Sequence, residues 1–357
     1  MKRFLLICTV LLVLGACVVY ITQYTSFAPF SQLDQEPEYF VEVRDKEIFL
    51  LSEEGASSFT VKGVDMGAGI PGAFATEFAI SYDMYMEWFG LIQEMNANTI
   101  RVYTISDPVF YHAFYDYNKN NPDPLYLLHG VWVDDDVVRG SNDAYAEKFI
   151  DVFKEDCRKL VDVLHGNRAI GYNSRHGHGT YSWDVSPWVM GYILGVEWEP
   201  DLVLYTNDVQ EHNAAYDGTF LYTDENATAF EGMLARVGDT LIEYEMRKYG
   251  DQRLLAFSNW PETDPLHHEQ WRLEQNTNLA RLDVEHIHAK ENFETGMFAS
   301  YHIYPYYPAF LEFEESYAGY VDETGKGNAY RAYLMSINEH HTIPVVIDNT
   351  AHRSPEG

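Results

Sequence analysis

Residues 189–200, with the sequence VMGYILGVEWEP, decide the fold of this chain. The first six residues are apolar without alternation, which is typical of a strand that is covered on both faces. Glu197, Trp198 and Glu199 follow this run directly. Parallel α/β barrels carry their active sites at the carboxyl ends of their strands, so the stretch predicts a barrel strand that ends in a catalytic acid. The alternative is a strand that ends in solvated acids.

Six further apolar segments alternate with helical patterns along the chain. This alternation predicts a parallel sheet, and the length fits one (β/α)8 TIM barrel of the α/β class over residues 59–357. A barrel of this class needs eight strands, and the sequence indicates seven, so we expect a barrel that lacks its eighth strand. The six further segments are residues 59–65, 98–103, 124–132, 253–261, 298–308 and 343–348.

The first 25 residues predict a membrane-targeting segment. Two basic residues precede an apolar run over residues 4–21, which is nearly long enough to span a bilayer. The length of the run favours a signal anchor, whereas LGAC at residues 14–17 resembles a bacterial lipoprotein signal that would leave Cys17 lipidated. In both cases we expect an extracytoplasmic protein attached to a membrane, with residues 26–58 as a linker and lead-in strands.

Composition and charge restrict the partners of this protein. The net charge of -31 argues against nucleic acid and anionic membrane surfaces, because both repel an acidic chain. Aromatic residues make up 15% of the sequence, and tyrosine and tryptophan rings suit surfaces that stack on sugars. Cys157 is the only cysteine outside the N-terminal segment, so no disulfide framework is expected there. We expect no metal and no cofactor.

Polar and aromatic residues gather at the predicted carboxyl ends of the strands. Such a rim suits glycoside cleavage, in which one carboxylic acid protonates the leaving oxygen and a second carboxylate attacks the anomeric carbon. Glu197 is the candidate acid, and Glu199 is the second choice because Pro200 follows it. Tryptophan rings would stack on the sugar. The candidate substrate-binding residues are Asp65, Arg101, Tyr103, Trp132, Trp198, Trp260, His302 and Tyr304.

The chain resembles the clan of retaining glycoside hydrolases with TIM barrels, especially its cellulase-like and β-1,3-glucanosyltransferase-like families. The resemblance rests on residues 59–65, on NTIRVY at 98–103 and on GVEW at 195–198, and it extends from about residue 59 to the end. It implies a β-linked glycan as substrate and Glu197 as the acid/base. It also implies that Arg101 lies near the nucleophile and that His302 or Tyr304 orients it by hydrogen bonding.

The chain departs from the clan's pattern at two positions. The residue before the acid/base is usually asparagine, and here it is Val196. In the seventh strand the clan's glutamate nucleophile is replaced by Asn349, whose neutral amide is a far poorer nucleophile. The resemblance therefore predicts an impaired or inactive enzyme.

A shift of reading frame offers one explanation for Asn349. If DNTAHRSPEG at residues 348–357 is encoded by suitable codons, one nucleotide inserted after codon 348 restores Glu-Tyr-Gly at the nucleophile position. The hypothesis is that the chain is truncated by a frameshift near codon 349, which also accounts for the missing eighth strand.

Two functions remain open from the sequence. The first is a glycoside hydrolase or transglycosylase that acts on β-linked glycans by a retaining, two-carboxylate mechanism. The second is a non-catalytic cell-surface protein that binds glycans on the same scaffold. The sugar, the linkage and the acceptor are not determined by these motifs.

Overall fold

A computed structural model describes residues 2–28, 31–133, 142–172, 176–275, 278–305 and 310–350 of the chain. Seven strands within these residues form one sheet in the spatial order β14-β13-β11-β9-β6-β5-β4, and every neighbouring pair is parallel. The strands are β4 (Gly63–Asp65), β5 (Thr99–Val102), β6 (Tyr126–Val131), β9 (Val189–Leu194), β11 (Leu254–Asn259), β13 (Ala299–His302) and β14 (Val345–Asn349).

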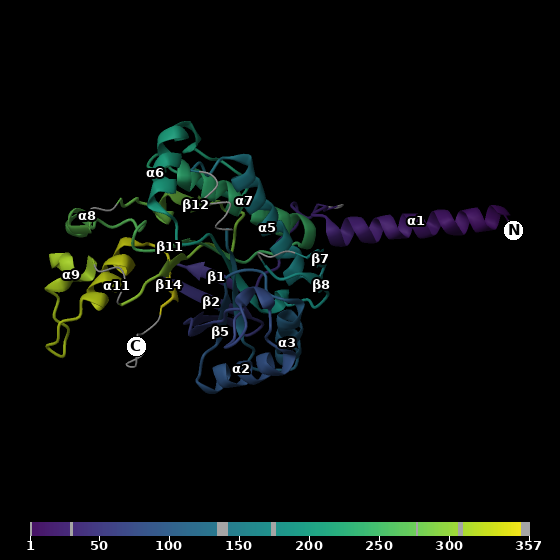
Figure 1. The fold of residues 1–357 in the computed structure, drawn as a ribbon, viewed down its shortest axis with the longest axis horizontal. Coiled ribbons are helices and arrows are strands. Elements are labelled where there is room, and N and C mark those ends of the chain that lie inside the picture. Colours follow the sequence, from purple (N-terminus) through teal and green to yellow (C-terminus); the bar gives the residue numbers. More distant parts are fainter. Residues whose placement is uncertain are drawn as a thin grey trace.

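This sheet curves into a nearly closed barrel flanked by helices, which confirms the predicted fold. The longer helices are α1 (Lys2–Tyr24), α2 (Tyr82–Glu94), α3 (Pro108–Asn118), α5 (Glu147–Leu164), α6 (Pro200–Val209), α7 (Ala229–Tyr249) and α11 (Ala329–His340). Three short helices, α8 (Glu269–Gln275), α9 (Phe310–Phe313) and α10 (Glu315–Ala318), lie between the last strands in sequence. In Figure 1 α1 projects from the barrel as a separate helix.

The central strand β9 is buried along all six residues, as its continuous apolar sequence predicts. Close packing requires glycine at two positions of the barrel wall. A Cβ on Gly191 in β9 would lie 2.8 Å from the carbonyl oxygen of Leu254, and one on Gly130 in β6 would lie 2.4 Å from that of Tyr103. Both approaches are shorter than atoms tolerate, so a larger residue would displace the neighbouring backbone.

A small antiparallel sheet precedes the barrel. It consists of β1 (Val41–Arg44), β2 (Glu47–Ser52) and β3 (Gly55–Phe59). Val41 and Ile48 pack in one apolar cluster with Met190, Leu254 and other residues near the amino ends of the barrel strands. The small sheet therefore covers the amino end of the barrel and leaves the carboxyl end open for a site. Two further antiparallel pairs are β7 (Arg168–Ile170) with β8 (Gly179–Tyr181), and β10 (Leu221–Thr223) with β12 (Ile287–Ala289).

The barrel wall is interrupted between β4 and β14. Both strands line a cavity of about 800 Å³ that extends from Lys46 and Glu47 at the amino end to Asp65 and Asp348 at the carboxyl end. No strand of the described residues occupies this position. The seven-stranded sheet thus agrees with the expected absence of the eighth strand, and residues 351–357 lie outside the described part of the chain.

Some predicted boundaries differ from the structure. The first strand was predicted over residues 59–65, but β3 ends at Phe59 and the barrel strand β4 begins only at Gly63. The sixth strand was predicted over residues 298–308 and ends at His302. The first apolar run begins in the loop between β3 and β4, and the second continues beyond His302, with residues 306–308 outside the described part of the chain. Apolar sequence marks burial and does not by itself mark where sheet pairing starts or stops.

Candidate active site

Glu197 lies just beyond the carboxyl end of β9. Gly195 adopts a φ of +112°, where only glycine is unstrained, and a Cβ there would lie 2.4 Å from the ring of Trp198. The chain therefore turns at Gly195, directs Trp198 into the core and leaves the Glu197 side chain 32% exposed. Glu199 is exposed at the amino terminus of α6, and no hydrogen bond from its side chain caps that helix.

The last residue of β13 and a residue that follows this strand hold the Glu197 carboxylate. Nδ1 of His302 lies 2.9 Å from Oε1 of Glu197, and the Tyr304 hydroxyl donates a hydrogen bond of 3.2 Å to the same oxygen. The resemblance implied that His302 or Tyr304 would orient the nucleophile. The structure instead places both on the candidate acid/base.

Arg101 forms a buried ion pair at the base of the site. Its Nε lies 2.8 Å from Oδ2 of Asp348, and both side chains are almost completely inaccessible to solvent. Arg101 was expected near the nucleophile position at residue 349, and it contacts the carboxylate one residue earlier. The register between β13 and β14 shifts here, so that His302 pairs with Asn349 and Asp348 has no partner residue on β13.

His302 connects the two carboxylates. Its Nε2 lies 3.4 Å from Oδ2 of Asp348, while its Nδ1 contacts Glu197. Burial opposes protonation of the ring, but the contacts with Asp348 and Glu197 outweigh burial and raise the pKa of His302 to about 9. Burial likewise opposes the charge of Asp348, and the Arg101 charge and the His302 contact together hold the pKa of Asp348 below its usual range.

Asn349 is the last residue of β14 and is half-buried. Its carbonyl oxygen accepts a hydrogen bond of 2.9 Å from the backbone N–H of Ile303. The predicted nucleophile position therefore lies at the carboxyl end of the barrel beside the Glu197–His302 pair, and an uncharged amide occupies it.

Asp65 and Tyr103 extend the site toward β4 and β5. Partial desolvation in the cavity, opposed by Arg101 and reinforced by Asp348, raises the pKa of the Asp65 carboxyl to about 6, although the residue as a whole is exposed. Burial raises the pKa of the Tyr103 hydroxyl above its usual range. The guanidinium carbon of Arg101 lies 3.9 Å from the centre of the Tyr103 ring, so this tyrosine covers the buried ion pair on one side.

One tryptophan of the three expected to stack on sugars remains accessible. Trp132 is half-buried, with its ring centre 6.4 Å from that of His302 in a stacked arrangement and 6.0 Å from that of Tyr103. It therefore belongs to the rim of the site.

The expected stacking roles of Trp198 and Trp260 do not fit the structure. Trp198 is completely buried, packs against Phe230 and donates a hydrogen bond of 3.1 Å to the carbonyl oxygen of Ser258. Trp260 is 8% exposed and donates one of 2.8 Å to the carbonyl oxygen of Trp198. These indoles brace the loops beneath Glu197, and the sequence did not distinguish them from Trp132 because each follows a strand.

Asp348 is the site residue that the sequence analysis did not select. Its position, directly before the expected nucleophile in the seventh strand, was the available signal. Among the described residues, the groups with the spacing of a metal site are Asp283, His340 and His341, and His165, Glu245 and Asp251. Neither group includes a residue of the candidate site.

The comparisons with known proteins identify similar structures but no family. No protein-family model matches the chain, and no curated protein matches it. The similar solved structures include three glycoside hydrolases. The first is β-glucuronidase 2 of Bacteroides uniformis, covalently bound to cyclophellitol-6-carboxylate aziridine, with 11% identity, a TM-score of 0.44, and coverage of 88% of this chain and 27% of that one.

The other two structures have comparable scores. The endo-1,4-β-mannanase of Rhizomucor miehei has 11% identity and a TM-score of 0.49, over 89% of this chain and 83% of that one. The endo-laminarinase of Formosa Hel1_33_131 has 14% identity and a TM-score of 0.42, over 81% of this chain and 66% of that one. The chain thus spans about a quarter of the glucuronidase. Identities this low do not identify its substrate.

Proposed function

We propose that this protein binds a β-linked glycan at the carboxyl end of its barrel and that Glu197 is the general acid of glycoside cleavage. The observation that carries the proposal is the arrangement around Glu197. A carboxylate that is about one-third exposed is held by His302 and Tyr304 above a buried Arg101–Asp348 pair. An acid that protonates a glycosidic oxygen must be positioned in this way at an accessible rim.

The binding surface beside Glu197 suits a sugar. Trp132 and Tyr103 present ring surfaces, and Asp65 supplies a carboxylate for hydroxyl groups. Arg101 lines the cavity, and its Nη1 is buried without a hydrogen-bond partner among the described residues. A buried donor of this kind favours a water or a ligand hydroxyl in the cavity. The β-linkage follows from the resemblance at residues 59–65, 98–103 and 195–198.

A retaining mechanism also needs an accessible second carboxylate. The Asp348 side chain is completely buried and paired with Arg101, so it supports the charge balance of the site and does not reach an anomeric carbon. Asn349 stands at the nucleophile position with a neutral amide. We therefore propose that the chain binds glycans but cleaves them slowly, by hydrolysis or transfer.

Assays of two variants test this proposal. We expect the unmodified chain to hydrolyse an aryl β-glycoside weakly, and Asn349→Glu to raise the rate by about 10²-fold or more, because it supplies the covalent catalyst. Adding Glu197→Gln to that variant removes the general acid, whose contribution is about 10²–10⁴-fold. Glu199→Gln, at the exposed acid two residues later, is the matched control and leaves the rate unchanged.

The buried Asp348 and the neutral Asn349 favour one alternative, a glycan-binding protein without catalytic activity. Calorimetric titration with a panel of β-glucans distinguishes the two functions. Binding without turnover, even after Asn349→Glu, would establish the alternative. Absence of both binding and turnover across the panel would contradict both proposals.

The N-terminal helix supports a location outside the cytoplasm. The segment Phe4–Tyr24 is long and apolar enough to cross a bilayer, with a mean hydropathy of 2.9. We propose that it attaches the barrel to the membrane as a signal anchor, or through a lipid on Cys17. Mass spectrometry of the mature protein distinguishes the two forms.

A further inference from the structure

The apolar surface of α1 is not covered by the rest of the protein. Eleven of its large apolar side chains over residues 4–19 are between 49% and 75% exposed. The 21 residues of Phe4–Tyr24 span about 31 Å as a helix, close to the thickness of the hydrocarbon core of a bilayer. Tyr20 and Tyr24 stack at its carboxyl end with ring centres 5.4 Å apart, where aromatic residues favour the membrane interface. The lipid bilayer is therefore the partner that fits this surface.

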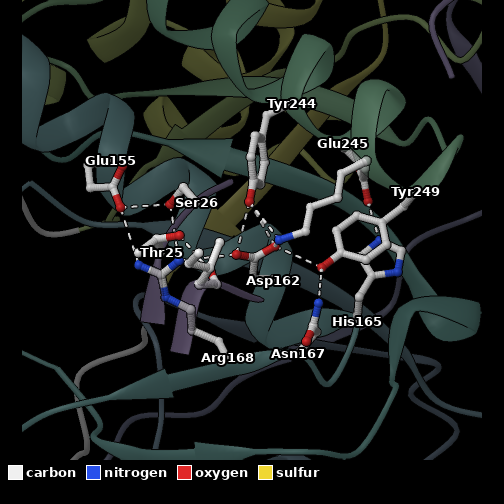
Figure 2. A network of polar contacts seen from close by, with 12 residues as sticks. Thr25, Ser26, Glu155, Asp162, His165, Asn167, Arg168, Tyr244, Glu245 and Tyr249 are labelled. Atoms are coloured by element: carbon white, nitrogen blue, oxygen red, sulfur yellow. Dashed lines mark hydrogen bonds and ion pairs between the residues drawn. The ribbon is translucent and has the colours of Figure 1, made fainter. Parts of the chain in front are cut away.

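The chain is fixed to the barrel immediately after this helix. The Ser26 hydroxyl donates a hydrogen bond of 2.7 Å to Oε1 of Glu155 in α5 and accepts one of 3.1 Å from Nη1 of Arg168 in β7. Arg168 also donates to Glu155 at 3.2 Å. Figure 2 shows Ser26 between these two residues, with a hydrogen bond to each. The attachment point lies two residues beyond the end of α1, so little chain remains that could act as a flexible tether.

A buried network supports Arg168 from behind. Asp162 is completely buried and accepts hydrogen bonds from Arg168 at 3.2 Å, from Lys248 at 2.7 Å and from the hydroxyls of Tyr244 and Tyr249 at 3.0 and 2.7 Å. Two cations and two hydroxyls thus satisfy one buried carboxylate (Figure 2). A network that is satisfied in this way is rigid, and it joins α5, α7 and β7 into one base for Ser26.

The connection between α1 and β1 also contacts the carboxyl end of α7. The backbone N–H of Gln32 donates to the carbonyl oxygen of Arg247 at 3.1 Å, and that of Glu38 donates to the carbonyl oxygen of Gly250 at 2.9 Å. Both acceptors lie at the carboxyl end of α7. The contacts of Ser26, Gln32 and Glu38 therefore hold the connection between α1 and β1 against the barrel at several points.

These contacts all lie at the amino end of the barrel, opposite Glu197. Asp162 and Tyr249 belong to the last turns of helices that return to the amino ends of the strands, and Arg168 follows α5 closely. In Figure 1 α1 leaves the molecule on the side of β7 and β8, whereas α8 and α9 lie on the opposite side.

We propose that Ser26, Glu155, Arg168 and Asp162 form a membrane-proximal clamp that fixes the amino end of the barrel toward the bilayer and points the Glu197 rim away from it. The six residues of β9 alone separate the two ends by about 20 Å. The site then reaches a glycan that lies beyond the protein and does not reach a sugar on a lipid headgroup of the same membrane. This inference rests on the proposed membrane attachment and not on glycan cleavage.

Energy transfer from a labelled residue to acceptor lipids in proteoliposomes tests the orientation. One donor is placed at Asp34→Cys, between Gln32 and Glu38, and the other at Leu273→Cys in α8; both native side chains are exposed. Cys8 and Cys17 are changed to alanine in a chain that keeps α1, and the buried Cys157 is retained. Because the ends of the barrel are about 20 Å apart, we expect transfer at least about twofold stronger from residue 34 than from residue 273. Equal transfer, or stronger transfer from residue 273, would overturn the proposal.

Two variants test whether the clamp causes the orientation. An insertion of about ten Gly and Ser residues between Tyr24 and Thr25 frees the barrel from the helix. The ratio of energy transfer from the amino-end donor to transfer from the donor at residue 273 should then fall from about two toward one. Ser26→Ala with Glu155→Gln removes the clamp contacts without removing Arg168 and should lower the ratio in the same direction. Ser57→Ala, an exposed serine of β3, is the matched control and keeps the ratio.

The outcomes separate this inference from the proposed function. A ratio that the insertion leaves unchanged would show that the clamp does not set the orientation. A mature protein that begins after Tyr24 would remove the membrane contact and overturn the inference. Hydrolysis of a soluble aryl β-glycoside in detergent depends on the Glu197 site and not on the orientation of the barrel at a membrane, so either proposal can fail while the other stands.

Discussion

His302 stands between two carboxylates, and its charge links the stability of the protein to pH. Its pKa in the folded protein, about 9, exceeds the usual value of 6.5. Protonation therefore stabilises the fold fully below about pH 6.5, and this contribution is lost as the pH rises through about 9. The shift corresponds to roughly 3 kcal/mol.

Chemical denaturation of a His302 variant tests this linkage. The loss of unfolding free energy between pH 6 and pH 9.5 should be smaller in His302→Gln than in the unmodified chain, by up to about 3 kcal/mol. His212→Gln, at an exposed histidine, should lose as much as the unmodified chain. An identical loss in His302→Gln would mean that the ring is neutral in the folded protein.

The Arg101–Asp348 pair is expected to behave as a unit. Arg101→Met leaves the buried Asp348 carboxylate without its main partner and should lower the unfolding free energy by about 3–5 kcal/mol. The double variant Arg101→Met/Asp348→Leu removes both charges and should recover much of this loss. Urea denaturation measures all three chains, and strictly additive losses would argue against direct coupling.

Single residues also show what the sequence could not determine. Arg101, His302 and Tyr304 were chosen because they lie toward the ends of predicted strands, and the structure brings them together with Glu197 and Asp348. Whether the Asp348 or the Asn349 side chain enters the site depends on the register shift between β13 and β14. One residue of register exchanges the two faces of a strand, and this shift leaves no mark in an apolar pattern.

Among the elements, the strands of the barrel wall tolerate little added volume. Gly130→Ala places a methyl group against the Tyr103 carbonyl, directly after the neighbouring strand β5, and should lower the unfolding free energy by about 1–3 kcal/mol or more. Gly171→Ala, where a Cβ meets no atom within 4 Å, should have little effect. Thermal denaturation compares the stabilities of the two variants. If Gly130→Ala were as stable as Gly171→Ala, β5 and β6 would be able to move apart at little cost in free energy.

The same elements explain why most of the fold was predictable. The run at residues 189–194 and the other buried strands are apolar on both faces. One face packs against the surrounding helices and the other faces the barrel interior, so an apolar run is enough to locate these strands in the sequence. Short strands at the barrel edge are less distinct. β4 has three residues, none of them buried, and its pairing with β5 defines it more than its sequence does.

For the whole molecule, the interruption between β4 and β14 sets the order in which the barrel opens. The outer edges of these two strands border a cavity, whereas β9 is paired on both sides and fully buried. Local opening requires least free energy where backbone hydrogen bonds face a solvated gap.

Amide protons of residues 63–65 and 345–349 should therefore exchange with deuterium much faster than those of residues 189–194. Hydrogen-exchange mass spectrometry would show this as separate kinetic phases, and uniform protection along the sheet would contradict it. The barrel is therefore expected to unfold locally at β4 and β14 first, while the opposite part of the wall around β9 keeps its structure.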